Sequence, residues 1–278
     1  MKKKTKCFLK FMVLILFVLL SVFTVWSSLE IETTYYSYSN DKIPQSFKGF
    51  KIAHVSDFHN SSFGDEIIEI LKDNKPDIIA ITGDVIDSYD TKIEVSVDFI
   101  KELIEIAPCY FVMGNHEARI EDYDSFKLQI ESFGVVVLED KATEISKNGE
   151  SISIYGVCDP SFFVDYLEDD NEAQIIEQLN SLKVSENFNM LLSHRPEFFE
   201  YYVEKEFDLV LSGHAHGGQF RLPLIGGLFA PGQGLFPKYD AGEFEKNGTT
   251  MFISRGFTNG AFRIRFNNRP QVIFIEFV

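Results

Sequence analysis

Short polar stretches recur along this chain, and each of them follows an apolar run. The apolar runs have the length of buried strands, so the polar residues stand where a strand is expected to end. Five of the six histidines fall inside these stretches, beside carboxylate and amide side chains. The candidate functional residues are Asp57, His59, Asp84, Asn115, His116, His194, His214 and His216.

Carboxylate oxygens, amide oxygens and imidazole nitrogens are ligands for hard or borderline divalent metals. Two ions held close together need a shared ligand, and Asp84 suits that role because it follows Gly83 in an expected tight turn. Asp57 and His59 are two residues apart, so they can face one ion together, and Asn115 adds a neutral oxygen. We therefore expect a dinuclear metal site. The remaining ligands would be His194, His214 and His216.

The patterns between these residues alternate between strands and helices. Strands are expected at 50–56, 77–82, 109–113, 135–138, 151–157, 187–193 and 207–212, and helices at 65–74, 91–107, 122–133, 171–182 and 196–203. A strand-rich tail follows at 250–254, 262–266 and 272–278. This order predicts α/β layers with a mixed sheet or two packed sheets. Sites in such folds gather beyond the carboxyl ends of the strands, where all the motifs stand.

The first 29 residues predict a membrane segment. Five lysines precede residue 11, and residues 11–29 run without a charge, close to the ~20 residues that cross a bilayer core. The lysines predict a cytoplasmic N-terminus and an extracytoplasmic remainder. A cleaved signal peptide is the alternative, although its apolar region would be ~7–15 residues long and no Ala-x-Ala-like cleavage site follows. The expected layout is a basic tail at 1–10, a transmembrane anchor at 11–29, a linker or edge strand at 30–46 and the catalytic domain at 47–278.

The chain is strongly acidic. Its 278 residues carry a formal net charge of −16, and setting aside the five N-terminal lysines leaves 21 basic against 42 acidic residues, a net of −21. Such a body is a poor general binder of nucleic acid. An anionic substrate would need a local positive centre, which divalent cations would supply. Three cysteines without a Cys-x-x-Cys motif exclude a disulfide framework and a cysteine-based zinc site.

The motifs, taken in order, resemble those of the calcineurin-like metallophosphoesterases. The matching strings are Asp57-x-His59, Gly83-Asp84, Gly114-Asn115-His116-Glu117, the lone His194 and Gly213-His214-x-His216. The resemblance runs from about residue 47 to the C-terminus. The expected N-terminal anchor is similar to that of the membrane-bound bacterial phosphodiesterases of this superfamily.

The resemblance implies a four-layer α-β-β-α sandwich, two packed mixed sheets flanked by helices. It implies two metal ions that share Asp84, and it makes His116 the catalytic histidine and not a ligand. One ion would bind Asp57, His59, Asp84 and His216, and the other Asp84, Asn115, His194 and His214. The mixed oxygen and imidazole ligands fit manganese, with iron, zinc or cobalt as alternatives, better than calcium.

The expected reaction is hydrolysis of a phosphodiester. A water between the two ions would lose a proton, and the resulting hydroxide would attack phosphorus in line while His116 stabilises or protonates the leaving oxygen. The alternatives are a pyrophosphatase or phosphomonoesterase acting on a lipid-linked or nucleotide head group, and a non-catalytic binding module of the same fold. No Gly-x-Ser-x-Gly elbow, Walker motif or dinucleotide fingerprint is present. The oligomeric state is not predicted.

Other residues near the motifs are expected to have other roles. His54 points away from Asp57 in strand alternation, so it is expected to be structural or to support a ligand. Asp87 and Asp90 are expected to cap the following helix instead of binding metal. Salt bridges within the acidic body are expected for Arg255, Arg263 and Arg265, with contact to a substrate phosphate as the alternative.

Residues 217–242 form the longest expected loop and begin directly at the His214 and His216 pair. The loop is rich in glycine, proline and apolar residues, and loops of this length in compact domains tend to be functional. It either packs on the domain or contacts a lipid or an aromatic leaving group near the membrane.

Overall fold

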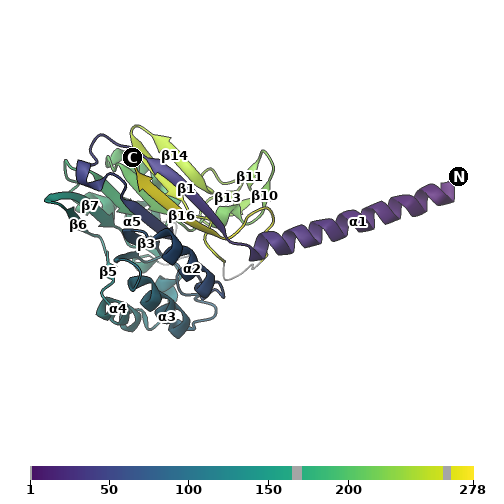
Figure 1. Ribbon diagram of the computed structural model, residues 1–278, viewed down its shortest axis with the longest axis horizontal. Coiled ribbons are helices and arrows are strands. Elements are labelled where there is room, and N and C mark those ends of the chain that lie inside the picture. The colour runs from purple at the N-terminus through teal and green to yellow at the C-terminus, as the bar shows by residue number, and fades with distance from the viewer. Residues whose placement is uncertain (1, 165–170, 259–263) are drawn as a thin grey trace.

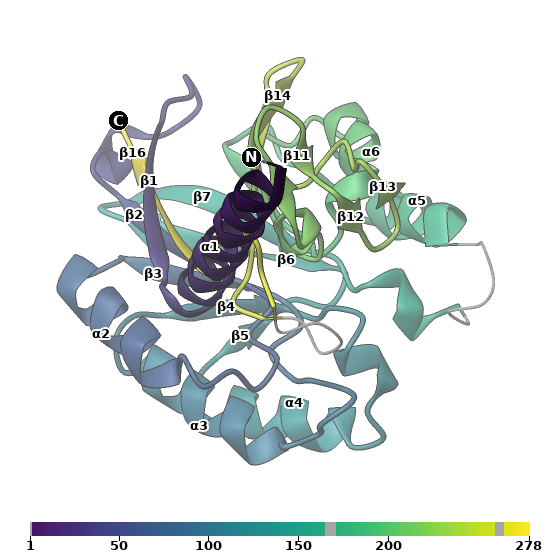
Figure 2. The same cartoon turned by 90° about the vertical axis from the view of Figure 1, so that its right-hand side faces the viewer.

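The computed structural model describes residues 2–164, 171–258 and 264–278. Two six-stranded sheets pack face to face, and helices cover the outer faces of both (Figure 2). A long helix, α1 (Lys2–Leu29), projects from this body (Figure 1). The four-layer α-β-β-α sandwich implied by the resemblance is confirmed.

The first sheet has the strand order β1-β16-β2-β3-β4-β5. Its strands are β1 (Glu32–Tyr38), β2 (Lys51–Val55), β3 (Ile78–Thr82), β4 (Cys109–Val112), β5 (Val136–Val137) and β16 (Gln271–Phe277). Every pairing is parallel except that of β16 with β2. Because β2, β3 and β4 run in one direction, their carboxyl ends meet at one edge of the sheet.

The second sheet has the order β14-β15-β9-β8-β7-β6. Its strands are β6 (Lys141–Lys147), β7 (Glu150–Gly156), β8 (Asn189–Leu192), β9 (Leu209–Ser212), β14 (Gly242–Lys246) and β15 (Thr249–Ile253). The four central strands are parallel, and the two outer pairings are antiparallel. The ends of β8 and β9 therefore also share an edge.

Helices form the two outer layers. The first sheet is covered by α2 (Gly64–Asn74), α3 (Ile93–Ile104) and α4 (Tyr123–Ser132), and the second by α5 (Asn171–Ser181) and α6 (Phe199–Glu204). Short 3₁₀ helices are η1 (Gln45–Phe47), η2 (Glu117–Arg119), η3 (Pro160–Phe162), η4 (Pro196–Phe198) and η5 (His216–Gly218). Ile52, Leu211 and Phe252 belong to the apolar cluster between the two sheets. Burial of such side chains is the main favourable term in folding.

Helix α1 is long and apolar enough to cross a membrane by length and composition. Only Glu30 and Ile31 separate its end from β1, and Ile31 is buried. The body therefore begins almost directly where the helix ends.

Among the strands of the two large sheets, β6 and β14 lie outside the predicted strands, because their largely polar and exposed residues lack a clear apolar pattern. Residues 217–242 contain four two-residue strands, which pair as the small hairpins β10–β11 and β12–β13. The strand expected at 262–266 is wrong over 264–266, where an isolated bridge joins Phe266 to Phe220, while residues 262 and 263 lie outside the described residues.

The expected helix caps at Asp87 and Asp90 are also wrong. Helix α3 begins after Lys92, and no side chain caps it. Asp87 instead accepts a hydrogen bond from the Tyr89 amide at 2.9 Å, which closes a local turn. Asp90 pairs with Lys92 at 2.7 Å.

Candidate metal centre

The candidate site residues converge beyond the carboxyl ends of five strands from both sheets. They follow β2 (Asp57, His59), β3 (Asp84), β4 (Asn115, His116), β8 (His194) and β9 (His214, His216). A direct link between the sheets is the His214 amide, which donates to Asp57 Oδ1 at 3.1 Å. Stretches far apart in sequence are thus brought together at one end of the sandwich.

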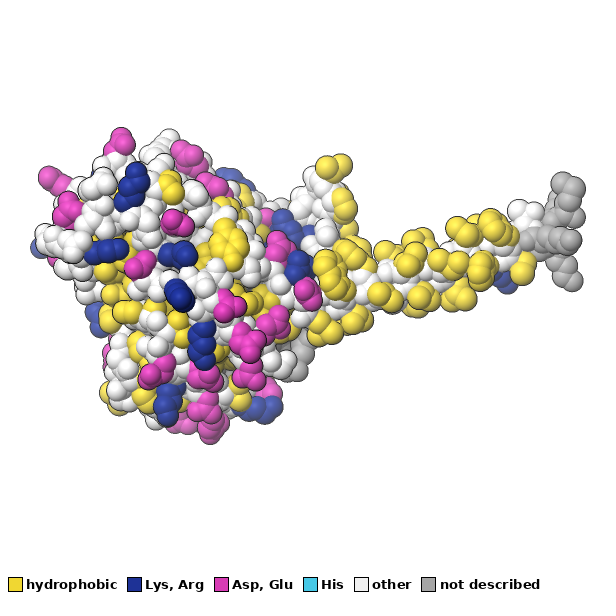
Figure 3. Space-filling model, in the orientation of Figure 1, with side chains coloured by type: hydrophobic (Ala, Val, Ile, Leu, Met, Phe, Trp, Pro, Cys, Tyr) yellow, Lys and Arg dark blue, Asp and Glu magenta, His cyan; other side chains and the backbone are white. Residues whose placement is uncertain are grey.

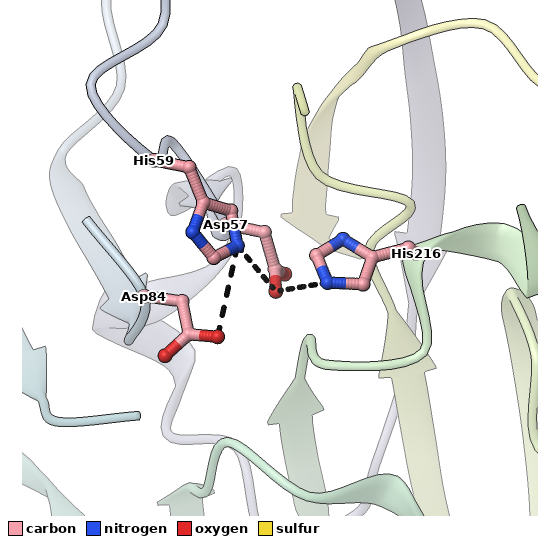
Figure 4. A group of neighbouring side chains, drawn as sticks. All are labelled: Asp57, His59, Asp84 and His216. Atoms are coloured by element: carbon pink, nitrogen blue, oxygen red, sulfur yellow. Dashed lines mark ion pairs between the residues drawn. The ribbon is translucent and has the colours of Figure 1, made fainter. Parts of the chain in front are cut away.

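Asp57, His59, Asp84 and His216 form one buried group of potential ligands (Figure 4). His59 Nε2 lies 3.7 Å from Asp84 Oδ2 and 4.0 Å from Asp57 Oδ1. His216 Nε2 lies 3.7 Å from Asp57 Oδ1. Ligand atoms at about 2.0–2.2 Å from one ion lie roughly 3–4 Å from one another, so this spacing suits a single cation.

Asp84, His194 and His214 form a second group. His194 Nε2 lies 3.1 Å from Asp84 Oδ2, the oxygen that also faces His59. His214 Nδ1 lies 3.1 Å from His194 Nε2. Asp84 is therefore common to both groups, which is the placement that a bridging carboxylate needs.

Several buried polar atoms at this site have no hydrogen-bond partner within the part of the chain that the structure describes. They include Asn115 Oδ1 and both ring nitrogens of His59. Buried polar atoms are normally hydrogen bonded, so each exception calls for an explanation. Oxygen and imidazole donors in this arrangement fit two divalent cations of borderline character.

Glu117 holds the backbone around Asp84, a role that the motif alone did not indicate. Its carboxylate is buried and accepts hydrogen bonds of 2.8–3.0 Å from the amides of Asp84, Val85, Ile86 and Gly114. Charge-assisted bonds of this kind are stronger than neutral ones. The turn after β3 is thereby tied to the turn after β4.

Gly114 and Gly213 allow this close approach of backbone and ligands. A Cβ on Gly114 would lie 2.7 Å from the Asp84 amide nitrogen and 2.9 Å from the Asp84 carboxyl carbon. A Cβ on Gly213 would lie 2.9 Å from Ser56 Cβ and would overlap the Asp57 carboxylate. Both separations are shorter than real Cβ contacts, so only glycine fits.

The ring orientation of His194 follows from its contact with Thr82. His194 Nδ1 lies 2.7 Å from the Thr82 carbonyl oxygen, which can only accept, so Nδ1 carries a proton and Nε2 is the nitrogen that faces Asp84. A backbone carbonyl that fixes the tautomer in this way is common behind metal ligands. His54 is buried beside the same residue, with Nε2 2.8 Å from Thr82 Oγ1, as expected for a structural histidine.

His116 lies at the edge of the first group, with its ring centroid 4.4 Å from that of His59. The Ser88 amide donates to His116 Nδ1 at 3.0 Å. Because an amide N–H can only donate, Nδ1 bears the lone pair and the proton of the neutral ring is on Nε2. Asp87 Oδ1 lies 3.7 Å from His116 Nδ1, although the sequence had placed Asp87 at a helix cap.

Burial dominates the electrostatics of the site. It raises the pKa of Asp57 to about 7, and burial together with Asp84 raises that of Glu117 to about 7. Burial lowers the pKa of His59 to about 3. Burial alone would also lower the pKa of His194, but Asp84 raises it to about 10. Divalent cations would stabilise these carboxylates and would compete with the proton on His194.

Arg265 is a further buried charge near these residues. Its Nη1 donates to the Arg255 carbonyl at 2.8 Å, and its Nη2 has no hydrogen-bond partner among the described residues. Burial lowers its pKa to about 9, while Asp57 opposes that shift. The expected salt bridge is found for Arg255, which lies 3.0 Å from Glu32, but the described residues give none for Arg265. Arg263 lies outside the described residues.

Known proteins resemble this chain in both sequence and fold. The model of the calcineurin-like phosphoesterase family matches residues 50–218. An uncharacterized metallophosphoesterase of Bacillus subtilis, YkuE, is 28% identical over 250 residues, which cover 87% of this chain and 84% of YkuE. The phosphodiesterase YaeI of Escherichia coli is 28% identical over 238 residues, 82% of each protein.

The fold is also found in a crystal structure of TT1561 from Thermus thermophilus, with a TM-score of 0.54 and 14% identity over 76% of this chain and 91% of TT1561. The family match spans more than half of the chain, from β2 to the end of η5, and so includes every candidate ligand. The chain therefore belongs to the calcineurin-like phosphoesterase family, and it is a metal-dependent hydrolase of phosphoesters.

Proposed function

We propose that this enzyme hydrolyses phosphodiesters with two divalent cations bound beyond the strand ends. The observation that carries the proposal is the place of Asp84 in both groups of buried ligand atoms. The preference for diesters is supported by the relative YaeI, which is named a phosphodiesterase.

One cation would be held by Asp57, His59, Asp84 and His216, and the other by Asp84, Asn115, His194 and His214. Such ions supply Lewis acidity, which acidifies water and neutralises the charge of phosphate oxygens. Manganese is the proposed metal, with iron, zinc or cobalt as alternatives, because the donors mix carboxylate, amide and imidazole.

His116 is the proposed catalytic histidine. The Ser88 amide occupies its Nδ1, so the ring proton is held at Nε2. From there the Nε2–H group would donate a hydrogen bond to the leaving oxygen and stabilise the negative charge that develops on it. Packing against His59 keeps the ring at the edge of the ligand group.

We further propose that α1 anchors the enzyme in the membrane, with the N-terminus in the cytoplasm and the catalytic domain outside. The support is the uncharged run at 11–29 and the lysines that precede it. The proposed layout is a tail at 1–10, an anchor at 11–29, the connecting strand region at 30–46 and the catalytic domain at 47–278.

The test compares bis(p-nitrophenyl) phosphate with p-nitrophenyl phosphate, using the full chain purified in detergent. We expect diester turnover that exceeds monoester turnover, stops on chelation and returns when manganese is added. Faster turnover of the monoester would contradict the diester assignment and favour the phosphatase alternative. Binding of two ions without turnover of either substrate would favour a non-catalytic module.

A further inference from the structure

The segment from Phe220 to Phe236, which we call the apolar lip, exposes an unusual amount of apolar surface. It comprises the hairpins β10–β11 and β12–β13, with β10 (Arg221–Leu222), β11 (Gly226–Gly227), β12 (Phe229–Ala230) and β13 (Gly234–Leu235). Its exposed large side chains are Leu222, Leu224, Ile225, Phe229, Leu235 and Phe236. Contiguous exposed apolar residues mark an interaction site more often than scattered ones do.

The lip also differs from the rest of the body in charge. It contains no acidic residue, whereas acids outnumber bases twofold in the chain beyond residue 29. Its one charged residue is Arg221, which is paired with Asp240 at 2.9 Å. A partner of the lip therefore meets apolar side chains without a carboxylate among them.

The lip lies on the side of the body from which α1 emerges. Figure 1 places β10, β11 and β13 on that side, and Figure 2, viewed toward the helix, places β11, β12 and β13 beside it. Figure 3 shows apolar side chains both along α1 and on a projection of the body next to its base. The apolar surface of the lip is thus close to that of the helix.

Residues 264–269 join the lip to the base of α1. On the helix side, Ser27 Oγ donates to the Arg265 carbonyl at 2.7 Å, and the rings of Phe23 and Phe266 are 5.4 Å apart. On the lip side, the Arg221 amide donates to the Phe266 carbonyl at 2.9 Å. One short segment thus holds the helix and the lip in a fixed relation.

The same contacts reach the metal centre. Asn268 Nδ2 donates to the carbonyl of His216 at 2.7 Å, and the Leu228 amide in the lip donates to the Gly218 carbonyl at 3.0 Å. Glu197, whose Oε1 lies 3.9 Å from His214 Nε2, is packed against Gly232 in the lip. The lip therefore borders the site and the anchor together.

The link between α1 and the body is too short to let this face move away from a membrane. Two residues, Glu30 and Ile31, connect Leu29 to β1, and a fully extended chain spans at most about 3.6 Å per residue. Where α1 crosses a bilayer, the surface around its base must meet the headgroups. The apolar lip is on that surface.

From these contacts we propose that the apolar lip inserts into the bilayer beside α1 and holds the metal centre against the headgroups, so that the substrate is the phosphoester of a membrane lipid. This inference rests on the proposed function of α1 and of the metal centre. Apolar insertion, and not attraction to anionic lipid, drives the contact, because the body is acidic and the lip lacks free positive charge. The contact therefore does not require anionic lipid.

The first test measures insertion of the lip with the full chain in phosphatidylcholine liposomes. A nitrobenzoxadiazole label is placed at Leu224→Cys, with Cys7→Ser to remove the exposed thiol, while Cys109 and Cys158 are buried and do not react. We expect a blue shift of the label and quenching by lipids that carry a spin label on the acyl chain.

The matched control carries the label at Leu128→Cys. Leu128 is 68% exposed, but it lies on α4 and away from the base of α1. Its label should stay in water and escape quenching. The proposal would be overturned if the labels at 224 and 128 gave the same emission wavelength and the same quenching in chains that float with the liposomes. Failure to float would instead refute the anchor.

The second test separates lipid substrates from soluble ones. The variant Leu224→Asp with Ile225→Asp should lose roughly tenfold or more of its turnover of a chromogenic lipid phosphodiester in liposomes, because charged side chains enter hydrocarbon unfavourably. Its turnover of bis(p-nitrophenyl) phosphate should stay intact, as should both activities of Leu128→Asp. An equal loss on both substrates, or none on the lipid, would overturn the proposal. No turnover of the soluble diester by the unmodified chain would refute the proposed phosphodiesterase function instead.

Discussion

The metal centre and the apolar lip break the usual distribution of side chains in opposite ways. At the metal centre, Asp57 and Asp84 are buried among imidazoles, and Asn115 Oδ1 lacks a partner. In the lip, the Leu224 side chain is fully exposed to solvent, with a relative exposure of 108%. A buried carboxylate and an exposed cluster of leucine and phenylalanine are the two informative exceptions to the rule that apolar groups go inside.

Each region presents groups that a partner outside the chain would stabilise. Buried carboxylates need a positive partner, because an isolated buried charge is strongly unfavourable. Exposed apolar side chains need an apolar partner, because water contact is unfavourable for them. The two regions meet at residues 216–220, so the cations and the bilayer are expected on neighbouring parts of one face.

The largest expected effect comes from removing the shared carboxylate. Asp84→Asn should lose bound metal, and its turnover should fall by more than roughly 10²-fold. This loss is larger than the one expected from changing a residue that only supports a metal ligand. Metal analysis and diester turnover of the purified chain measure this. The matched control is Asp90→Asn, whose carboxylate pairs with the exposed Lys92 and which should leave both values unchanged. Two bound ions in Asp84→Asn would contradict the bridging role.

His116→Ala should keep its metal and lose activity. The expected loss of turnover is about 10²–10⁴-fold, the span for general acid–base groups. The combination of intact metal content with a low rate distinguishes a residue that stabilises the leaving oxygen from a metal ligand. Loss of metal in this variant would make His116 a ligand, and a full rate would remove its catalytic role.

Glu117→Gln tests the carboxylate that holds the turns after β3 and β4. An amide presents a donor to the four amides that now meet carboxylate oxygens, so metal affinity should fall about 10–100-fold, the usual effect of an outer contact. Competition with a fluorescent chelator measures the affinity. Glu121→Gln, a nearby change at an exposed residue, should leave it unaltered. Equal affinities in the two variants would show that Glu117 does not position the ligands.

The smallest effect is expected for the stability of the lip. Leu224→Ser should change the free energy of unfolding by at most about 0.5 kcal/mol, as exposed positions do. Leu211→Ala, at a fully buried leucine between the sheets, should instead cost about 2–5 kcal/mol. Urea unfolding of the detergent-solubilised chain compares them. A large loss of stability in Leu224→Ser would mean that Leu224 packs on the body and is not free to enter a bilayer.

Much of this enzyme could be predicted from local patterns. The apolar runs at β2, β3, β4, β8 and β9 indicate buried strands, and the polar residues after each run indicate a site at their carboxyl ends. Polar edge strands such as β6 escaped prediction because a strand that faces water needs little apolar pattern. The expected helix cap at Asp87 is wrong because Asp87 takes part in a turn of its own, and this turn brings its side chain toward His116.

The amino-acid sequence by itself determined which donors are present, their order and the strands that carry them, since these depend on neighbouring residues. Only the tertiary structure decided that Asp84 faces both ligand groups, that Glu117 ties two turns together and that the lip stands beside α1. These relations join residues far apart in the chain, such as the His214 amide and the Asp57 carboxylate. Such contacts arise from the packing of two sheets and have no signature in local propensity.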